Sequence, residues 1–239
     1  MRFVASAEHG RRRPRTLRDV VTLAEDLFLL ACDDETGRLL TGPARLDLGL
    51  GGALLLDLAL RERVALVDSH VTVVDPAATG DLLLDAALSK IAGEAKARDR
   101  GYWVRHLAKG VRAAVEDRLV AAGVLRHDDH RMLGLIPTGH CTPEVDGRIE
   151  HELVGHLHDA VVLGHPASRE TAAVASLALA VGLERHLFPR ADRRAVRHRM
   201  QEIAEGQWVG AAVRQAVVAL DAALGIVPSP GWAVESTSW

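Results

Sequence analysis

The sequence predicts a mainly α-helical fold, a core helical bundle wrapped by amphipathic helices, with small β-hairpins. Apolar residues recur at three- and four-residue spacing through most of the chain, which is typical of helices with one buried face. The 239 residues are 48% hydrophobic, enough to bury a sizeable core without a disulfide or metal framework. Only residues 63–74 and 124–136 place short apolar runs around a polar turn, as hairpins do.

The first half of the chain is expected to alternate helices with these hairpins. Thr16 can cap a first helix whose apolar face extends to Phe28. After a connector over residues 38–50, Gly51-Gly52 is expected to open a second helix that ends at Arg61. The following elements are a hairpin over 63–74, a helix from Thr79-Gly80-Asp81 to Ile91, a long helix over 102–122 that is weakest at Gly110 and stops at Gly123, and the second hairpin over 124–136.

The second half is expected to be helical throughout, with proline and glycine separating the helices. The predicted segments are 147–163, 168–187, 192–205 and 207–224. We therefore divide the chain into a basic flexible arm over 1–15, a single mostly helical domain over 16–225 and a loose tail over 226–239.

The apolar runs, the net charge and the cysteines argue against a membrane-spanning, a highly basic and a disulfide-bonded protein. The longest apolar run, 208–224, is interrupted by Arg214 and Asp221, so it is expected to be a core helix and not a membrane span. The 29 basic and 32 acidic residues give a net charge of −3, which argues against a protein coated in positive charge. Cys32 and Cys141 are expected to be reduced, buried thiols.

No constellation in the sequence argues for an enzyme, a cofactor or a metal. His151 and His156 superficially resemble a zinc-protease pair. They are five residues apart, however, and the resulting rotation of about 500° places them on different faces of the helix. The sequence also lacks a nucleophile elbow and a phosphate-binding loop. We expect no catalytic residues, no cofactor and no metal site.

An anion site is the more interesting prediction. If Gly51-Gly52 opens a helix, its free amides and the positive end of the helix dipole would attract a phosphate. Arg105, Lys109 and Arg112, at i, i+4 and i+7, would line one face of the long helix nearby. The alternatives are glycines that permit close packing and a row of cations that simply faces solvent.

The order of these motifs resembles the Golgi phosphoprotein 3 family, peripheral membrane proteins that bind phosphatidylinositol 4-phosphate. The preference for Arg over Lys further suggests a bacterial member. The resemblance extends over about 16–224 and rests on residues 22–30, Gly49-Leu50, Gly52, 55–61, 79–81, 83–85, Val111-Arg112, 119–120 and 123–125.

The resemblance implies a basic pocket for a lipid headgroup beside an apolar loop that enters the bilayer. The family's two basic helix positions fall on Lys109 and Arg112, but its pocket arginine falls on Gly51 and its loop tryptophan on about Gly42. Arg45 is a candidate substitute for the lost charge. The expected headgroup-binding residues are therefore Lys109, Arg112, Gly51, Gly52 and Arg45, and the expected membrane-contacting residues are Leu39, Leu40, Leu46 and Leu48.

The implied partners are an anionic phospholipid surface, cytosolic tails of membrane proteins and a second copy of the chain. The implied location is cytoplasmic, on a membrane face that is the Golgi in eukaryotic relatives. The cations of the arm together with Lys109 and Arg112 would contribute at most about 6 kcal/mol, close to the marginal binding of one acyl chain. Stable attachment would then need apolar insertion or avidity.

Two other functions stay open from the sequence. Helix followed by hairpin is also the order of a winged helix, and the arginine-rich arm could enter a nucleic-acid groove, although the net charge does not favour this partner. The loss of pocket residues instead favours an adaptor that binds protein tails and has a degenerate lipid site.

Overall fold

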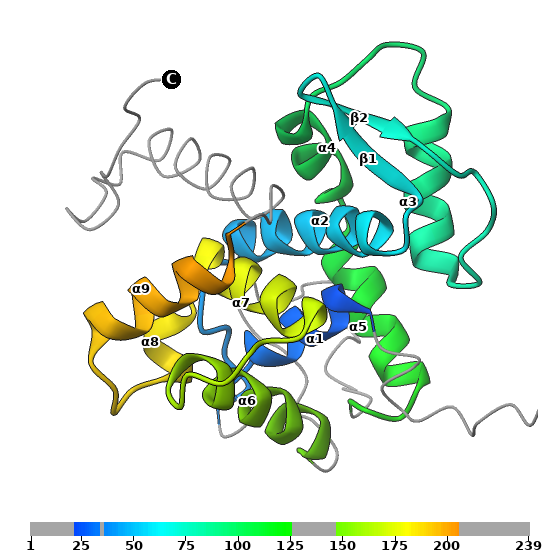
Figure 1. Ribbon diagram of the computed structural model, residues 1–239. Helices are drawn as coiled ribbons and strands as arrows, with labels where there is room; N and C mark the ends of the chain where they lie inside the picture. The colour runs from blue at the N-terminus through cyan, green and yellow to red at the C-terminus, as the bar shows by residue number, and fades with distance from the viewer. Residues whose placement is uncertain (1–21, 34–35, 126–146, 206–239) are drawn as a thin grey trace, which may run out of the picture.

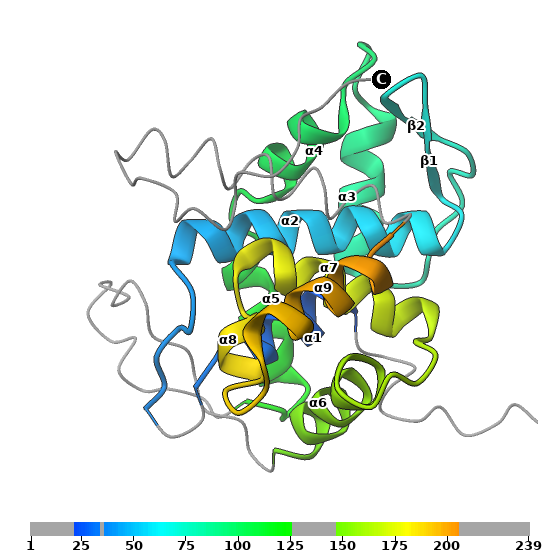
Figure 2. The ribbon, with the colours of Figure 1, turned by 60° about the vertical axis from the view of Figure 1, so that its left-hand side comes forward.

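The computed structural model describes residues 22–33, 36–125 and 147–205. Within these ranges the chain forms nine helices and one two-stranded antiparallel hairpin, so the mainly helical fold is confirmed. Helix α2 (Pro43–Leu60) crosses the molecule. Helices α3, α4 and the hairpin lie on one side of it, and α1 and α5–α9 lie on the other (Figures 1 and 2).

Helix α1 (Leu23–Leu30) begins later than the sequence pattern indicates. Its N-cap is Thr22, whose hydroxyl accepts a hydrogen bond from the Glu25 amide while the Glu25 carboxylate accepts one from the Thr22 amide. This capping box defines the start of the helix, so the prediction of Thr16 as its cap is wrong. The described members of the predicted apolar face, Ala24, Leu27 and Phe28, are buried, as expected.

The first hairpin and helix α3 follow the prediction. Strand β1 (Val64–Val67) pairs with β2 (His70–Val73) in the register Val67↔His70. Asp68 and Ser69, both at positive φ, form the two-residue turn, since a tight hairpin needs this twist. Helix α3 (Leu82–Ala92) is capped by Asp81 as the Thr79-Gly80-Asp81 signal suggests.

This helix–hairpin pair is not a DNA-binding winged helix. The helix that precedes the hairpin is α2, and its residues 49–58 are buried. A recognition helix must present its side chains to a groove, which a core helix cannot do.

The long helix expected over 102–122 is two helices. Helix α4 (Arg100–Leu107) ends before Gly110, which has φ 73°, and helix α5 (Val111–Ala121) begins directly after it. A glycine in the left-handed conformation cannot continue an α-helix, so Gly110 divides the predicted helix into two. The second predicted hairpin lies almost entirely outside the described residues.

The C-terminal helices are close to expectation. Helices α6 (Arg148–Val161) and α9 (Arg193–Ile203) match their predicted segments. The segment 168–187 is divided into α7 (Arg169–Val181) and the short α8 (Glu184–Leu187) by Gly182 at φ 80°. The predicted arm, the 207–224 helix and the tail lie outside the described residues.

One expectation about the cysteines is wrong. Cys32 is buried and disulfide-bonded, not reduced. Cys141, the other cysteine of the sequence, lies outside the described residues.

A partly buried ion network joins α1, α3 and α5. Arg118 of α5 contacts the Glu25 carboxylate at 3.1 Å and the Asp81 carboxylate at 2.6 Å. Glu25 is only 4% exposed and also accepts hydrogen bonds from Thr22. Burial alone would raise the pKa of Asp81, but the Arg118 hydrogen bond and the Leu84 and Leu83 amides together lower that pKa below its ordinary 3.8. Arg118 thus stabilises two carboxylates that would otherwise be unpaired.

Replacing this arginine should therefore destabilise the protein strongly at neutral pH. We expect Arg118→Met to lower the free energy of unfolding by about 3 kcal/mol at pH 7, since it strands two carboxylates. Because the folded-state pKa of Asp81 is lowered, its contribution is present above pH 3.8 and is lost as the pH falls through the folded-state value. Urea denaturation at pH 7 and pH 3 should show the gap between variant and wild type narrowing in acid.

The exposed Arg193 provides the matched control. Arg193→Met should change stability by less than about 0.5 kcal/mol at either pH. If the difference in unfolding free energy between Arg118→Met and wild type is the same at pH 7 and pH 3, Arg118 does not act by stabilising the Asp81 carboxylate.

Candidate functional site

Gly51 and Gly52 lie inside a helix and do not open one. Helix α2 begins at Pro43, eight residues earlier, and both glycines are buried. Amides in a helix interior donate to the carbonyl four residues back and are not free to hold an anion. The expected cradle of Gly51 and Gly52 amides is therefore absent from the described structure, and the site prediction is wrong in this respect.

Close packing explains Gly51 instead. A methyl group on Gly51 would lie 2.5 Å from the backbone oxygen of Val104 and 2.7 Å from the amide nitrogen of Ala108. Both atoms belong to the C-terminal end of α4, so α2 touches the backbone of α4 directly. The alternative that glycine serves helix contact is the one the geometry supports.

The same face of α2 meets the start of α5. Asp47 lies one helical turn before Gly51 and therefore on the same face. Its Oδ1 is 3.3 Å from Nε of Arg112, in the first turn of α5. Lys109 lies in the turn between α4 and α5, directly after Ala108. The structure thus brings Lys109 and Arg112 to one place beside α2; we call these two residues with Asp47 the α4–α5 turn site.

The charges of the α4–α5 turn site are partly balanced. The Arg112 and Asp47 side chains are 26% and 31% exposed. Burial raises the pKa of Asp47, and the Arg112 charge lowers it by less. Lys109 is exposed and has no ion-pair partner among the described residues. No side chain caps the N-terminus of α5, so its first amides lack an intrahelical acceptor.

The other predicted basic residues are separated from this site. Arg45 is two residues from Asp47, about 200° around α2, and its guanidinium lies 4.0 Å from the position of a Gly182 Cβ at the end of α7. Arg105 is on α4, and because Gly110 breaks the helix it does not share a helix face with Arg112. The prediction that Arg105, Lys109 and Arg112 line one helix face is therefore wrong.

The expected membrane loop is tied to the core. The Leu40 amide donates to the Ala31 carbonyl, and the Thr41 hydroxyl donates to the Val181 carbonyl. Leu46 is fully buried, so it cannot contact a membrane in this structure, while Leu39, Leu40 and Leu48 are partly buried against the core. The large apolar side chains that are exposed in the described residues lie elsewhere, at Val67, Val74, Leu82, Val162 and Leu163.

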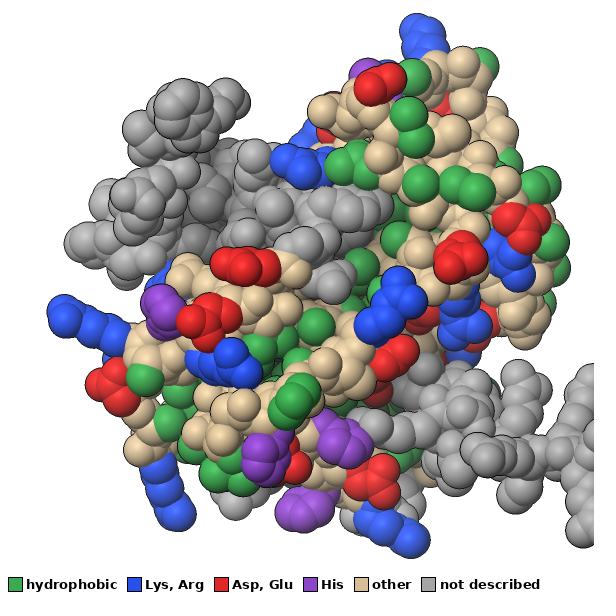
Figure 3. Space-filling model, in the orientation of Figure 1, with side chains coloured by type: hydrophobic (Ala, Val, Ile, Leu, Met, Phe, Trp, Pro, Cys, Tyr) green, Lys and Arg blue, Asp and Glu red, His purple; other side chains and the backbone are tan. Residues whose placement is uncertain are grey.

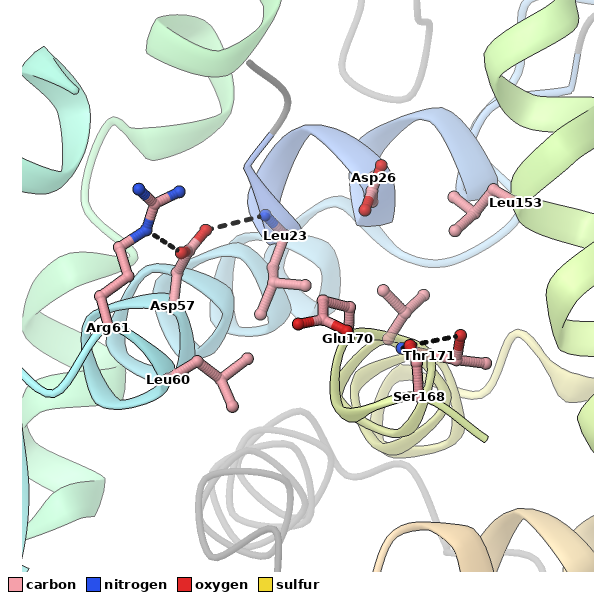
Figure 4. Close-up of a pocket in the computed structure, with 10 residues that line it drawn as sticks. Leu23, Asp26, Asp57, Leu60, Arg61, Leu153, Ser168, Glu170 and Thr171 are labelled. Atoms are coloured by element: carbon pink, nitrogen blue, oxygen red, sulfur yellow. Dashed lines mark hydrogen bonds and ion pairs between the residues drawn. The ribbon is translucent and has the colours of Figure 1, made fainter. Parts of the chain in front are cut away.

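A separate pocket of about 470 Å³ lies between α1, α2, α6 and α7 (Figure 4). Asp57 at its edge accepts hydrogen bonds from the Leu23 amide at 3.0 Å and from Arg61 at 2.6 Å. Sequence reasoning missed this pocket, although Asp57 and Arg61 at i, i+4 spacing were its available signal. The lining residues are Leu23, Asp26, Asp57, Leu60, Arg61, Leu153, Ser168, Glu170, Thr171 and Val174.

The surface shown in Figure 3 is of mixed charge. Its Lys and Arg side chains are interspersed with Asp and Glu, and histidines gather over α6. Among the described residues no group of three His, Cys, Asp or Glu side chains is arranged to hold a metal ion. Nor does any helix in the described ranges have both the length and the apolarity needed to cross a bilayer.

Comparison with known proteins decides the family. The family model of Golgi phosphoprotein 3 (GPP34) matches residues 23–220, which is most of the chain. The chain belongs to the Golgi phosphoprotein 3 family. This is a family of non-enzymatic trafficking adaptors, in agreement with the expectation that the chain is not an enzyme.

A curated relative gives a partial match. The vacuolar protein sorting-associated protein 74 of Eremothecium gossypii is 32% identical over 97 residues, 36% of this chain. The match spans 29% of that protein's length. Family members are peripheral proteins of the Golgi that associate with phosphoinositide membranes.

The packing role of Gly51 is directly testable. Gly51→Ala should lower the free energy of unfolding by about 2 kcal/mol, because the added methyl group forces α4 away from α2. Chemical denaturation monitored by circular dichroism measures this change.

Gly155 of α6 is the matched control, since it is exposed and has open space around its Cβ position. Gly155→Ala should raise stability by about 0.5–1 kcal/mol through helix propensity alone. The same sign of change in both variants would show that Gly51 is not a packing constraint.

Proposed function

We propose that this chain is a peripheral membrane protein that binds an anionic phospholipid headgroup, of the phosphatidylinositol 4-phosphate type, at the α4–α5 turn site. The observation that carries the proposal is that Lys109, directly after the Ala108 backbone that meets α2, and Arg112, paired with Asp47 of α2, both lie where α5 begins. Family membership supports the choice of lipid class, and the position of these two residues supports the choice of site.

The chemistry of the site suits a phosphate group. The Arg112 guanidinium contacts Asp47 through Nε and its side chain is 26% exposed, so we assign its terminal nitrogens to a bidentate contact with phosphate oxygens. Lys109 adds an exposed point charge, and the N-terminus of α5, the helix that carries Arg112, adds amides that no side chain caps. Gly51 and Gly52 contribute no free amide, and the Arg45 guanidinium lies near Gly182 at the end of α7, so none of these three residues is part of the proposed site.

Two cations give weak attachment, so a second contribution is part of the proposal. Each Lys or Arg near an anionic surface contributes about 1 kcal/mol, less than one acyl chain supplies. Because Leu46 is buried and the 38–42 loop is tied to α1 and α7, this loop does not supply apolar insertion. We propose that a second contact supplies the rest of the membrane affinity. This contact is with the cytosolic tails of membrane proteins or with a second copy of the chain, and the protein then lies on the cytoplasmic face of a membrane.

Vesicle binding tests the proposal. The wild-type chain should sediment with phosphatidylcholine vesicles that contain phosphatidylinositol 4-phosphate and not with phosphatidylcholine alone. Replacing both cations, Lys109→Ala with Arg112→Ala, should weaken binding about 30-fold, the equivalent of two charges at about 1 kcal/mol each.

The matched control removes the same charge from another helix start. Arg193 and Arg194 are exposed in the first turn of α9, and Arg193→Ala with Arg194→Ala should leave vesicle affinity within about twofold of wild type. Equal binding to both kinds of vesicle, or an equal loss in the two double variants, would rule out the α4–α5 turn site.

A further inference from the structure

The α4–α5 turn site contains an acidic residue whose position calls for an explanation. Asp47 places its Oδ1 3.3 Å from the Arg112 Nε that the proposed headgroup would approach. This oxygen is buried and makes no hydrogen bond in the described structure, so its contact with Arg112 is one of charge and not of directed bonding. A contact of this kind neutralises a cation without fixing the orientation of its guanidinium.

We propose that Asp47 is an internal counter-anion that weakens the headgroup site by neutralising Arg112 in the unliganded protein. The proposal rests on the function proposed above and concerns the control of that same site. A bound phosphate would share Arg112 with Asp47 or displace it, and in either case two anions would lie close together. The site is therefore set to low basal affinity, and a membrane with higher charge or a second contact is needed to hold the protein.

The alternative role, in which Asp47 orients Arg112 for the ligand, has less support. An orienting carboxylate usually accepts short, aligned hydrogen bonds from a guanidinium. Here the separation is long and the Asp47 oxygen has no hydrogen-bond partner. Loss of the carboxylate should consequently remove a repulsion and cost little pre-organisation.

The fold should tolerate the loss of the Asp47 charge. Burial raises the pKa of Asp47, so its environment favours the neutral form more than water does. Asp47→Asn keeps the size of the side chain and is expected to unfold at or slightly above the wild-type temperature. Asp47→Ala provides a second variant should the amide not be accommodated.

The test compares vesicle binding of Asp47→Asn with that of Asp68→Asn. Both changes alter the net charge by one unit, but Asp68 lies at the tip of the hairpin, where its positive φ also suits asparagine. On phosphatidylcholine vesicles containing phosphatidylinositol 4-phosphate, Asp47→Asn should bind about fivefold more tightly than wild type, the effect of one unit charge at a membrane surface. Asp68→Asn should stay within about twofold.

A double-variant cycle shows whether the effect passes through Arg112. In the Arg112→Ala background, the gain from Asp47→Asn should fall from about fivefold to about twofold, because the neutralised cation is gone. An undiminished gain would mean that Asp47 acts by general repulsion, which overturns the counter-anion assignment.

The remaining outcomes separate this inference from the proposed function. If wild type prefers the phosphoinositide vesicles and Asp47→Asn binds equally or more weakly, Asp47 is not a counter-anion, but the headgroup site stands. Equal gains in Asp47→Asn and Asp68→Asn would likewise overturn the inference. If neither wild type nor Asp47→Asn distinguishes these vesicles from phosphatidylcholine, the headgroup site itself is wrong.

Discussion

Two glycines spaced two residues apart let α2 make close contact with helices on opposite sides. A methyl group on Gly49 would lie 2.6 Å from a Val181 side-chain carbon, and one on Gly51 would lie 2.5 Å from the Val104 carbonyl oxygen. The two positions are about 200° apart around the helix, so one faces α1 and α7 and the other faces α4. The dense core around α2, and with it the position of every element that packs on this helix, depends on these contacts.

The contact at Gly51 also determines what kind of anion site this chain can form. The resemblance implies that the family's pocket arginine falls on this position, and here the backbone of α4 occupies the space where a side chain would begin. An arginine at this position would require α4 to move. The packing also gives a fixed location to the α4–α5 turn, which carries Lys109 and is followed by Arg112 beside Asp47.

The sequence predicted correctly those turns and helix starts whose residues favour a single local structure. Asp68-Ser69 between β-branched runs and the Asp81 cap both formed as expected. The Gly51-Gly52 pair was misread because glycine serves turns and close packing equally well. The signal against a turn was present in Leu46, Leu50, Ala53, Leu54 and Leu58, a helical repeat that continues through the glycines after Pro43 at a helix start. The partner of Arg112 and the location of the Arg45 guanidinium, by contrast, depend on which helices meet, and spacing along the chain does not encode this.

The two arginines of α5 show how similar side chains acquire different roles. Arg118 has two carboxylate partners with side chains 5% and 14% exposed, and its contact with Asp81 is 2.6 Å long. Arg112 has a single partner that is 31% exposed, at 3.3 Å and without a hydrogen bond to the facing oxygen. Removing Arg118 from its partners would strand buried charge, whereas Arg112 can exchange its partner for another anion at small cost. The number, burial and geometry of the partners, more than the residue type, are therefore the grounds on which we propose Arg112, and not Arg118, as the ligand-binding arginine of this helix.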